Sequence, residues 1–488
     1  MKYYSIFIII FILAFSSCGH SDETYKVQFQ INKPYCLLNF METLRTNGYF
    51  GPTLYEYYKK SQFNDDKNLK NIVAQYNKLR INYSYEFGGY PKYRFLSKGR
   101  STRDLFYILS AKSETLSEFK QISVGIIPNY QHQKLFGLFE AIEPIYDELI
   151  WNQYSRVAEQ RLHELEEYAK QINLNEKLMA VSDFFNSSWP EDIPLIVSFS
   201  IVPGEKIRLI PPPQGNVIFC GLLTEPVDNY TYIGKIVHEF AHRAFAEQPL
   251  KLHQQIDQWF LESKSPHKYM VNFMLNEALG GAIGHKVSDE LIGPHEFTYG
   301  QSFMRDYDEA IYPLVVSYLD EGKSIDSAFI DRSLKIYEET FPNALYDYHC
   351  LFQAYYLLTD VENYQGLPNL IMKNISSPLM YDLGAPIMDD GNMKKLITYD
   401  FTKLLVITKD NENTFNYLNS KLVELKRFED LDLESDFVLS FHDADGKAYI
   451  IMNLHSIERF ETVLKKLKAQ KTFTSEDPLM HLDENLER

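Results

Sequence analysis

Two histidines four positions apart, with a glutamate directly after the first, stand in the segment VHEFAHR at residues 237–243. Residues four apart lie on one face of a helix, so His238 and His242 can hold one ion from the same side. Glu239 can reach a water on that ion without being a ligand itself. The HExxH spacing therefore predicts a zinc site with an adjacent general base, which is the chemistry of hydrolysis.

A catalytic zinc needs a third protein ligand and an open position, so a further side chain must come from elsewhere in the chain. Glu277 is the candidate, because it lies in the apolar segment LNEALG, where a lone carboxylate is costly to bury without a cation. Gly280, Gly281 and Gly284 would let this segment approach the HExxH helix closely. In the alternative interpretation, Glu277 lies on a solvated face and the histidines only satisfy buried hydrogen bonds.

HEFAH followed, 35 positions after its second histidine, by a helical NEALG resembles the gluzincin zinc metallopeptidases, the thermolysin-like group. In that architecture paired strands precede the HExxH helix, and a later helix provides the glutamate ligand. The resemblance covers about residues 190–290. It implies that His238, His242 and Glu277 bind Zn²⁺ and that Glu239 activates water.

The sequence departs from thermolysin at Gly281, where that protein has an aspartate that orients a zinc-bound histidine. Support for the histidines must then come from another group, with Asn276, His285 or a backbone carbonyl as candidates. The metzincin pattern is not met, because Phe245 replaces its glycine and Gln248 replaces its third histidine.

The oxyanion formed during hydrolysis needs a donor besides zinc, and the resemblance implies a tyrosine or histidine from a later helix. Tyr346, Tyr348 and His349 are best placed by chain order, and we select His349 as the catalytic candidate. With 35 tyrosines in the chain, a structural role for these residues is the alternative. A peptide substrate would lie antiparallel on an exposed strand edge, for which the predicted strand 215–222 is the candidate.

The pattern of apolar residues predicts an α+β fold that is mainly helical, and the resemblance implies a gluzincin-like catalytic core within it. Residues 27–190 carry helical periodicity. Runs rich in β-branched and aromatic residues at 194–202 and 215–222 predict two antiparallel strands. The helices 231–247 and 268–287 then carry the candidate ligands.

A chain of 488 residues is long enough for about three domains. Residues 295–375 again indicate helices, and the order of strands and helices after Lys395 predicts a small α/β domain. The predicted divisions are a signal peptide (1–17), a tether (18–26), a helical N-terminal region (27–190), a zinc-binding catalytic region (191–394), a small α/β accessory domain (395–475) and a polar tail (476–488).

The chain begins with one lysine, an apolar run from Ile6 to Phe15, and two small residues before Cys18. That order predicts a secretory signal peptide, because the apolar run is too short to cross a bilayer. The small pair before Cys18 resembles the lipobox of bacterial lipoproteins. The resemblance implies a lipid anchor at Cys18 and a cell-envelope lipoprotein of the outer membrane, periplasmic or surface-exposed. The alternative is an ordinary cleaved secretory peptide.

Composition and charge exclude several classes of protein. A formal net charge of −17 and the lack of a long Lys/Arg run exclude nucleic acid as a partner. Cys36, Cys220 and Cys350 are far apart and lack CxxC spacing, which argues against a cysteine metal site and allows at most one disulfide. We therefore expect a zinc metallopeptidase acting on a peptide or protein. The alternatives are a non-catalytic surface lipoprotein that binds a polymer or partner, and a zinc hydrolase of non-peptide amides.

Overall fold

The computed structural model describes residues 26–48, 51–86, 88–89, 99–188, 190, 192–204, 215–296, 302–362, 364–428 and 431–482. The predicted signal peptide and Cys18 lie outside these residues, as does the tether except for Lys26. The described chain has an α+β fold that is mainly helical, as expected. Among its helices we find none with the length and apolar character needed to cross a membrane.

The N-terminal region is mostly helical, as its periodicity predicts, with one short strand pair, β2 (Ser84–Glu86) and β3 (Gly99–Ser101). A π-helical turn at Asp147–Trp151 joins its two longest helices. The helices of this region are α1 (Lys33–Arg45), α2 (Pro52–Lys59), α3 (Lys67–Asn77), α4 (Thr102–Ala111), α5 (Leu116–Ile122), α6 (Asn129–Tyr146), α7 (Asn152–Gln171) and α8 (Leu174–Phe185).

A three-stranded sheet follows, in the order β1-β4-β5, formed by β1 (Val27–Ile31), β4 (Leu195–Val202) and β5 (Val217–Leu223). Both pairings are parallel, so the predicted antiparallel pair is wrong, and β1 is a strand within the region predicted to be helical. Every residue of β4 and β5 is buried. Such a continuous apolar run indicates a strand covered on both faces, which is the usual situation of parallel strands.

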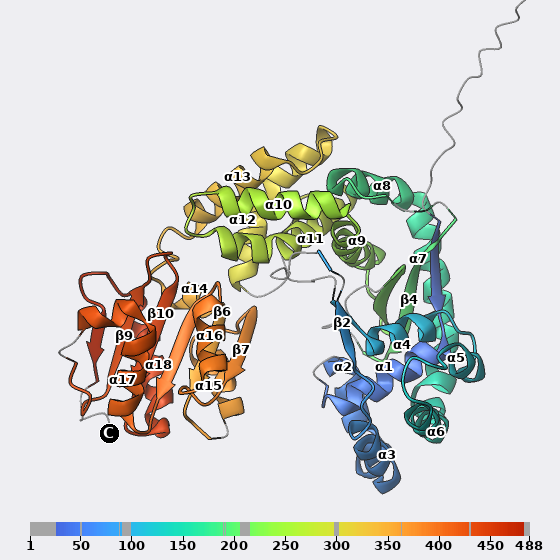
Figure 1. Ribbon diagram of the computed structural model, residues 1–488. Helices are drawn as coiled ribbons and strands as arrows, with labels where there is room; N and C mark the ends of the chain where they lie inside the picture. The colour runs from blue at the N-terminus through green and yellow to red at the C-terminus, as the bar shows by residue number, and fades with distance from the viewer. Residues whose placement is uncertain are drawn as a thin grey trace, which may run out of the picture.

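Two long helices form the centre of the molecule, α9 (Asn229–Ala246) and α11 (Lys268–Ile292), with α10 (Leu250–Glu262) between them in the chain. They pack closely at glycines, as expected. A Cβ atom added to Gly284 would lie 2.8 Å from the carbonyl oxygen of Gly234, a distance that only a residue without a side chain permits. Helices α12 (Ser302–Asp320) and α13 (Ser327–Thr340) continue this helical layer, which Figure 1 shows between the N-terminal helices and the C-terminal domain.

The C-terminal domain is a mixed six-stranded sheet in the order β11-β9-β10-β8-β6-β7. Alternate residues of its central strands enter two separate hydrophobic clusters, one on each face, so helices cover both sides of the sheet. Its strands are β6 (Ala354–Thr359), β7 (Met380–Gly384), β8 (Thr402–Ile407), β9 (Phe437–His442), β10 (Ala448–Asn453) and β11 (Leu479–His481). Its helices are α14 (Tyr348–Leu351), α15 (Leu367–Asn374), α16 (Asp390–Thr398), α17 (Asn411–Lys421) and α18 (Phe460–Gln470).

This domain is larger than predicted at both ends. Strand β6 lies in the region that was expected to be helical, and the sheet therefore begins well before residue 395. Strand β11 lies in the predicted polar tail and pairs with β9. The fully buried run AYYLLT of β6 has no amphipathic period, so its sequence does not distinguish a buried strand from a buried helix.

The first half of α11 packs against the C-terminal domain. The rings of Phe273 and Phe401 lie 5.4 Å apart, and the Lys447 ammonium lies 5.2 Å from the ring of Tyr269. Helix α11 therefore contacts both the C-terminal domain and α9, and it carries the predicted glutamate ligand one turn after Phe273.

Candidate metal centre

The packing of α9 against α11 brings His238, His242 and Glu277 together. The two histidine Nε2 atoms are 3.0 Å apart. Nε2 of His242 lies 3.2 Å from Oε2 of Glu277, and Nε2 of His238 lies 3.6 Å from Oε1 of the same carboxylate. Zinc bonds of about 2.05 Å in a tetrahedron place ligand atoms about 3.3 Å apart. Each imidazole nitrogen therefore lies at about that distance from the other and from one of the two carboxylate oxygens.

The opposite nitrogen of His242 faces a hydrogen-bond acceptor. Nδ1 of His242 lies 3.2 Å from Oδ1 of Asn276. An imidazole whose Nδ1–H donates presents the Nε2 lone pair on its other side. That lone pair, Nε2 of His238 and the Glu277 carboxylate then converge, an arrangement that is stabilised by a proton or cation between them. Of the candidates for histidine support, Asn276 occupies this position.

Gly280 lies directly against both imidazole rings. A Cβ atom at this position would be 3.0 Å from Cε1 of His242 and 3.3 Å from Cε1 of His238. A methyl group there would push the rings or the helix outward. The glycine at 280 therefore lets α11 carry Glu277 to within ligand distance of the histidines on α9.

Asp308 of α12 is a residue near the site that the sequence interpretation missed. It is 3% exposed, and its Oδ2 atom lies 2.5 Å from the position that a Cβ at Gly281 would take. Among the described residues its Oδ1 atom has no hydrogen-bond partner. Burial, together with the Glu277 charge, raises the pKa of Asp308 well above its usual value. The sequence spacing could have indicated that Asp308 is buried, because Asp308 follows Met304 by four residues and therefore lies on the same, buried face of α12.

Without a metal, this cluster holds a proton. Burial and then the neighbouring His242 lower the pKa of His238 to about 4. Burial also opposes protonation of His242, but the Glu277 carboxylate outweighs it and raises the pKa of His242 to about 9. Burial likewise opposes ionisation of Glu277, yet His242 lowers the pKa of Glu277 to about 2. The surroundings therefore stabilise a positive charge at the point where the three donor atoms meet.

Glu239 lies on α9 beside this cluster and is half-buried. Burial raises the pKa of Glu239 to about 7, and the Glu277 charge acts in the same direction. A general base works best when its pKa is close to the working pH. The position and the pKa of Glu239 both suit the predicted role.

The structure does not bring His349 into this group. His349 lies in α14, its backbone N–H bonds to Oδ1 of Asp347 at 2.8 Å, and its ring packs 6.0 Å from the ring of Phe303. The hydroxyl of neighbouring Tyr348 contacts Oγ of Ser440, 3.0 Å away in the C-terminal sheet. A role for His349 in binding the oxyanion stays a prediction without a supporting contact.

The predicted substrate edge is closed in this structure. Strand β5 lies at the end of its sheet, but all seven of its residues are buried. The edge therefore offers no open row of backbone groups to a peptide, and the expectation of an exposed edge is wrong.

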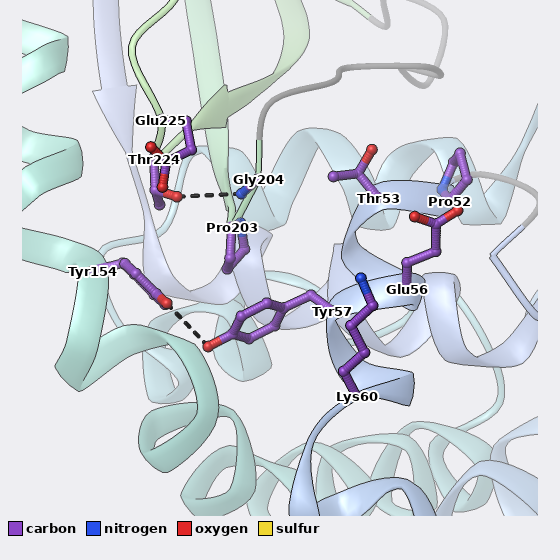
Figure 2. A pocket seen from close by; sticks show the side chains of 10 residues that line it. All are labelled: Pro52, Thr53, Glu56, Tyr57, Lys60, Tyr154, Pro203, Gly204, Thr224 and Glu225. Carbon is purple, nitrogen blue, oxygen red and sulfur yellow. Dashed lines mark hydrogen bonds between the residues drawn. The ribbon is translucent and has the colours of Figure 1, made fainter.

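A cavity of about 610 Å³ lies between α2 and the C-terminal ends of β4 and β5 (Figure 2). The hydroxyls of Tyr57 and Tyr154 meet across one side of it at 3.1 Å, and the N–H of Gly204 bonds Oγ1 of Thr224 at 3.2 Å on another. None of the described residues that line it belongs to the histidine–glutamate cluster. The cavity is therefore separate from the candidate metal centre.

Known proteins give no independent indication of function, because no family model, curated protein or solved structure matches this chain. The argument for function must therefore come from the geometry of the site.

Proposed function

We propose that this protein is a zinc-dependent hydrolase, a metallopeptidase of the gluzincin type, in which His238, His242 and Glu277 hold the metal. The observation that carries the proposal is the convergence of two Nε2 atoms and a carboxylate, with the His242 ring oriented from behind by the Asn276 amide oxygen. Zinc bound there would supply Lewis-acid activation of water and of a carbonyl group.

The donor set favours zinc over other ions. Two imidazoles and one glutamate carboxylate are the protein ligands of several catalytic zinc sites, whereas calcium and magnesium prefer oxygen ligands alone. Three protein ligands leave one position of a tetrahedron open. The Glu277 side chain is 29% exposed while both histidines are buried, so solvent reaches this group of residues from the side of Glu277.

Different residues of this chain would perform different steps of hydrolysis. Asn276 fixes the orientation of the His242 imidazole, and Gly280 lies directly against both rings. Glu239, with a pKa of about 7, takes a proton from the attacking water and can return it to the leaving amine. We further propose a peptide or protein substrate, and attachment to the outer membrane by a lipid on Cys18 with the enzyme on its periplasmic or outer face.

The test compares the wild-type chain without residues 1–17 with Glu239→Gln, and uses Glu159→Gln on the exposed side of α7 as the matched control. We expect zinc-dependent cleavage of a quenched-fluorescent peptide library. Glu239→Gln should keep the wild-type zinc content and lose at least about 10³-fold in kcat/KM, since it lacks the general base. The control variant should cleave like the wild type.

Two outcomes would overturn the proposal. Unchanged cleavage by Glu239→Gln would remove Glu239 as the base. A zinc-loaded wild type that cleaves no peptide in the library would contradict the proposed peptidase activity. If that protein cleaves small amides instead, it is a non-peptide amide hydrolase. If it cleaves neither peptides nor small amides, it is a non-catalytic binding lipoprotein.

A further inference from the structure

A second group of metal-ligating side chains lies further along α11. His285 and Asp289 stand four residues apart on this helix, and His295 follows shortly after its end. Nδ1 of His295 is 2.8 Å from Oδ1 of Asp289, and Nε2 of His285 is 3.5 Å from the same oxygen. One donor atom from each of the three lies within 4.8 Å of the others. This is again a set of two imidazoles and one carboxylate.

The local sequence explains how three ligands meet in so short a segment. The spacing of four residues places His285 and Asp289 on one face, one turn apart. Gly293 ends the helix with a φ of 84°, a conformation that suits glycine, and it turns the chain back over the last turn. The backbone N–H of His295 then bonds Oδ1 of Asp289 at 3.2 Å, and the two imidazole rings pack 4.3 Å apart.

A residue of the next helix holds the carboxylate from its other side. The Tyr312 hydroxyl of α12 donates to Oδ2 of Asp289 at 2.6 Å, so Oδ1 is the oxygen that faces the imidazoles. A supporting hydrogen bond of this kind, behind the carboxylate, is typical of ligands in metal sites.

We propose that His285, Asp289 and His295 bind a second zinc ion, which holds the end of α11 against α12. Imidazole with a single carboxylate favours zinc over magnesium or calcium. The first residue of this group is eight positions beyond Glu277 on the same helix, which is about 12 Å at 1.5 Å per residue. Metals that share one substrate are about 3.5–4 Å apart. The second ion would therefore take no part in the hydrolysis proposed for the first metal site.

The second ion would fasten α12 to the end of α11. Tyr312 of α12 binds the ligand Asp289, and one turn earlier in α12 Asp308 fills the space beside Gly281, next to the first site. An ion that joins α11, the turn after it and α12 would therefore stabilise the packing of α12 against α11, the helix that carries Glu277. The site is partly open to solvent, which allows the ion to enter and a water to complete the coordination.

The test is a count of bound zinc in the chain without residues 1–17, stripped with a chelator, reloaded, desalted and measured by mass spectrometry. Four variants are compared with the wild type, namely His295→Ala, His238→Ala, the double variant, and His163→Ala as control, whose side chain is 72% exposed on α7. We expect two zinc ions in the wild type and the control, one in each single variant and none in the double variant. Cobalt absorption spectra provide a second measurement of each site.

The pattern of losses separates this proposal from the proposed function. One ion in the wild type, lost in His238→Ala and kept in His295→Ala, would show that the second group is only a hydrogen-bonded network and would overturn the inference. One ion lost in His295→Ala and kept in His238→Ala would instead overturn the catalytic site and leave the second site standing. Circular dichroism of each zinc-free variant confirms that a loss of zinc does not come from unfolding.

Discussion

The Asp308 carboxylate fills the space that a side chain at Gly281 would occupy, 2.5 Å from where its Cβ would be. The gluzincin resemblance places an aspartate at position 281, four residues after the glutamate ligand. Here a glycine stands there, and the carboxylate beside it comes from the neighbouring helix α12. The proposed zinc site therefore draws on three helices, with the candidate ligands on α9 and α11 and a buried acid from α12.

Asp308→Asn tests this buried acid through pH. Burial raises the pKa of Asp308 in the folded state above its unfolded value, so the neutral acid stabilises the fold fully below about pH 4. That stabilisation is lost as the pH rises through the folded-state pKa. In zinc-free protein, urea unfolding should therefore show the free energy of the wild type falling with pH relative to Asp308→Asn. Parallel pH profiles would mean that Asp308 is ionised in the fold.

Gly280→Ala should weaken zinc binding, because the added methyl group would press on the rings of His238 and His242 at 3.3 and 3.0 Å. We expect a loss of about 10-fold or more, the range seen when the support of a metal ligand is disturbed. Competition with a chromogenic chelator measures it. The matched control is Gly137→Ala in α6, where nothing lies within 4 Å, and which should stabilise the protein by about 0.5–1 kcal/mol. Equal zinc affinity in both variants would show that the rings have room to move.

Asn276→Ala removes the acceptor behind His242 and should lower zinc affinity by about 10- to 100-fold. Asn272→Ala in the same helix is the control, because its amide bonds Asp257 at 2.9 Å instead of a histidine. Chelator competition compares the two. If Asn272→Ala weakens zinc as much as Asn276→Ala does, the effect comes from α11 as a whole and not from His242.

The three described cysteines should be unreactive in the folded protein. All are buried and free, so the disulfide that the sequence allows does not form. Burial raises the pKa of Cys36 to about 11 and that of Cys350 to about 12, and it also raises that of Cys220. Since only the thiolate reacts, iodoacetamide near neutral pH should label none of the three until the chain is unfolded. Peptide mass spectrometry locates the labels, and labelling of Cys220 in native protein would contradict the burial of β5.

The sequence determined the parts of the site that depend on local spacing. A separation of four residues in a helix places His238 beside His242 whatever surrounds them, and the apolar residues around Glu277 predicted that its carboxylate would lie near the two histidines. The glycines of α11 likewise predicted a close helix contact, which Gly280 and Gly284 make.

Only the tertiary structure decided what depends on contacts between distant segments. The direction of β5, the strand character of β6 and the place of Asp308 against Gly281 all follow from which element packs beside which. A buried apolar run can have the same composition in a parallel or an antiparallel strand. The sequence around a single aspartate in a helix does not indicate which residue of another helix packs against it. Periodicity records which face of an element is buried, whereas the partner on that face is set by the packing of the whole chain.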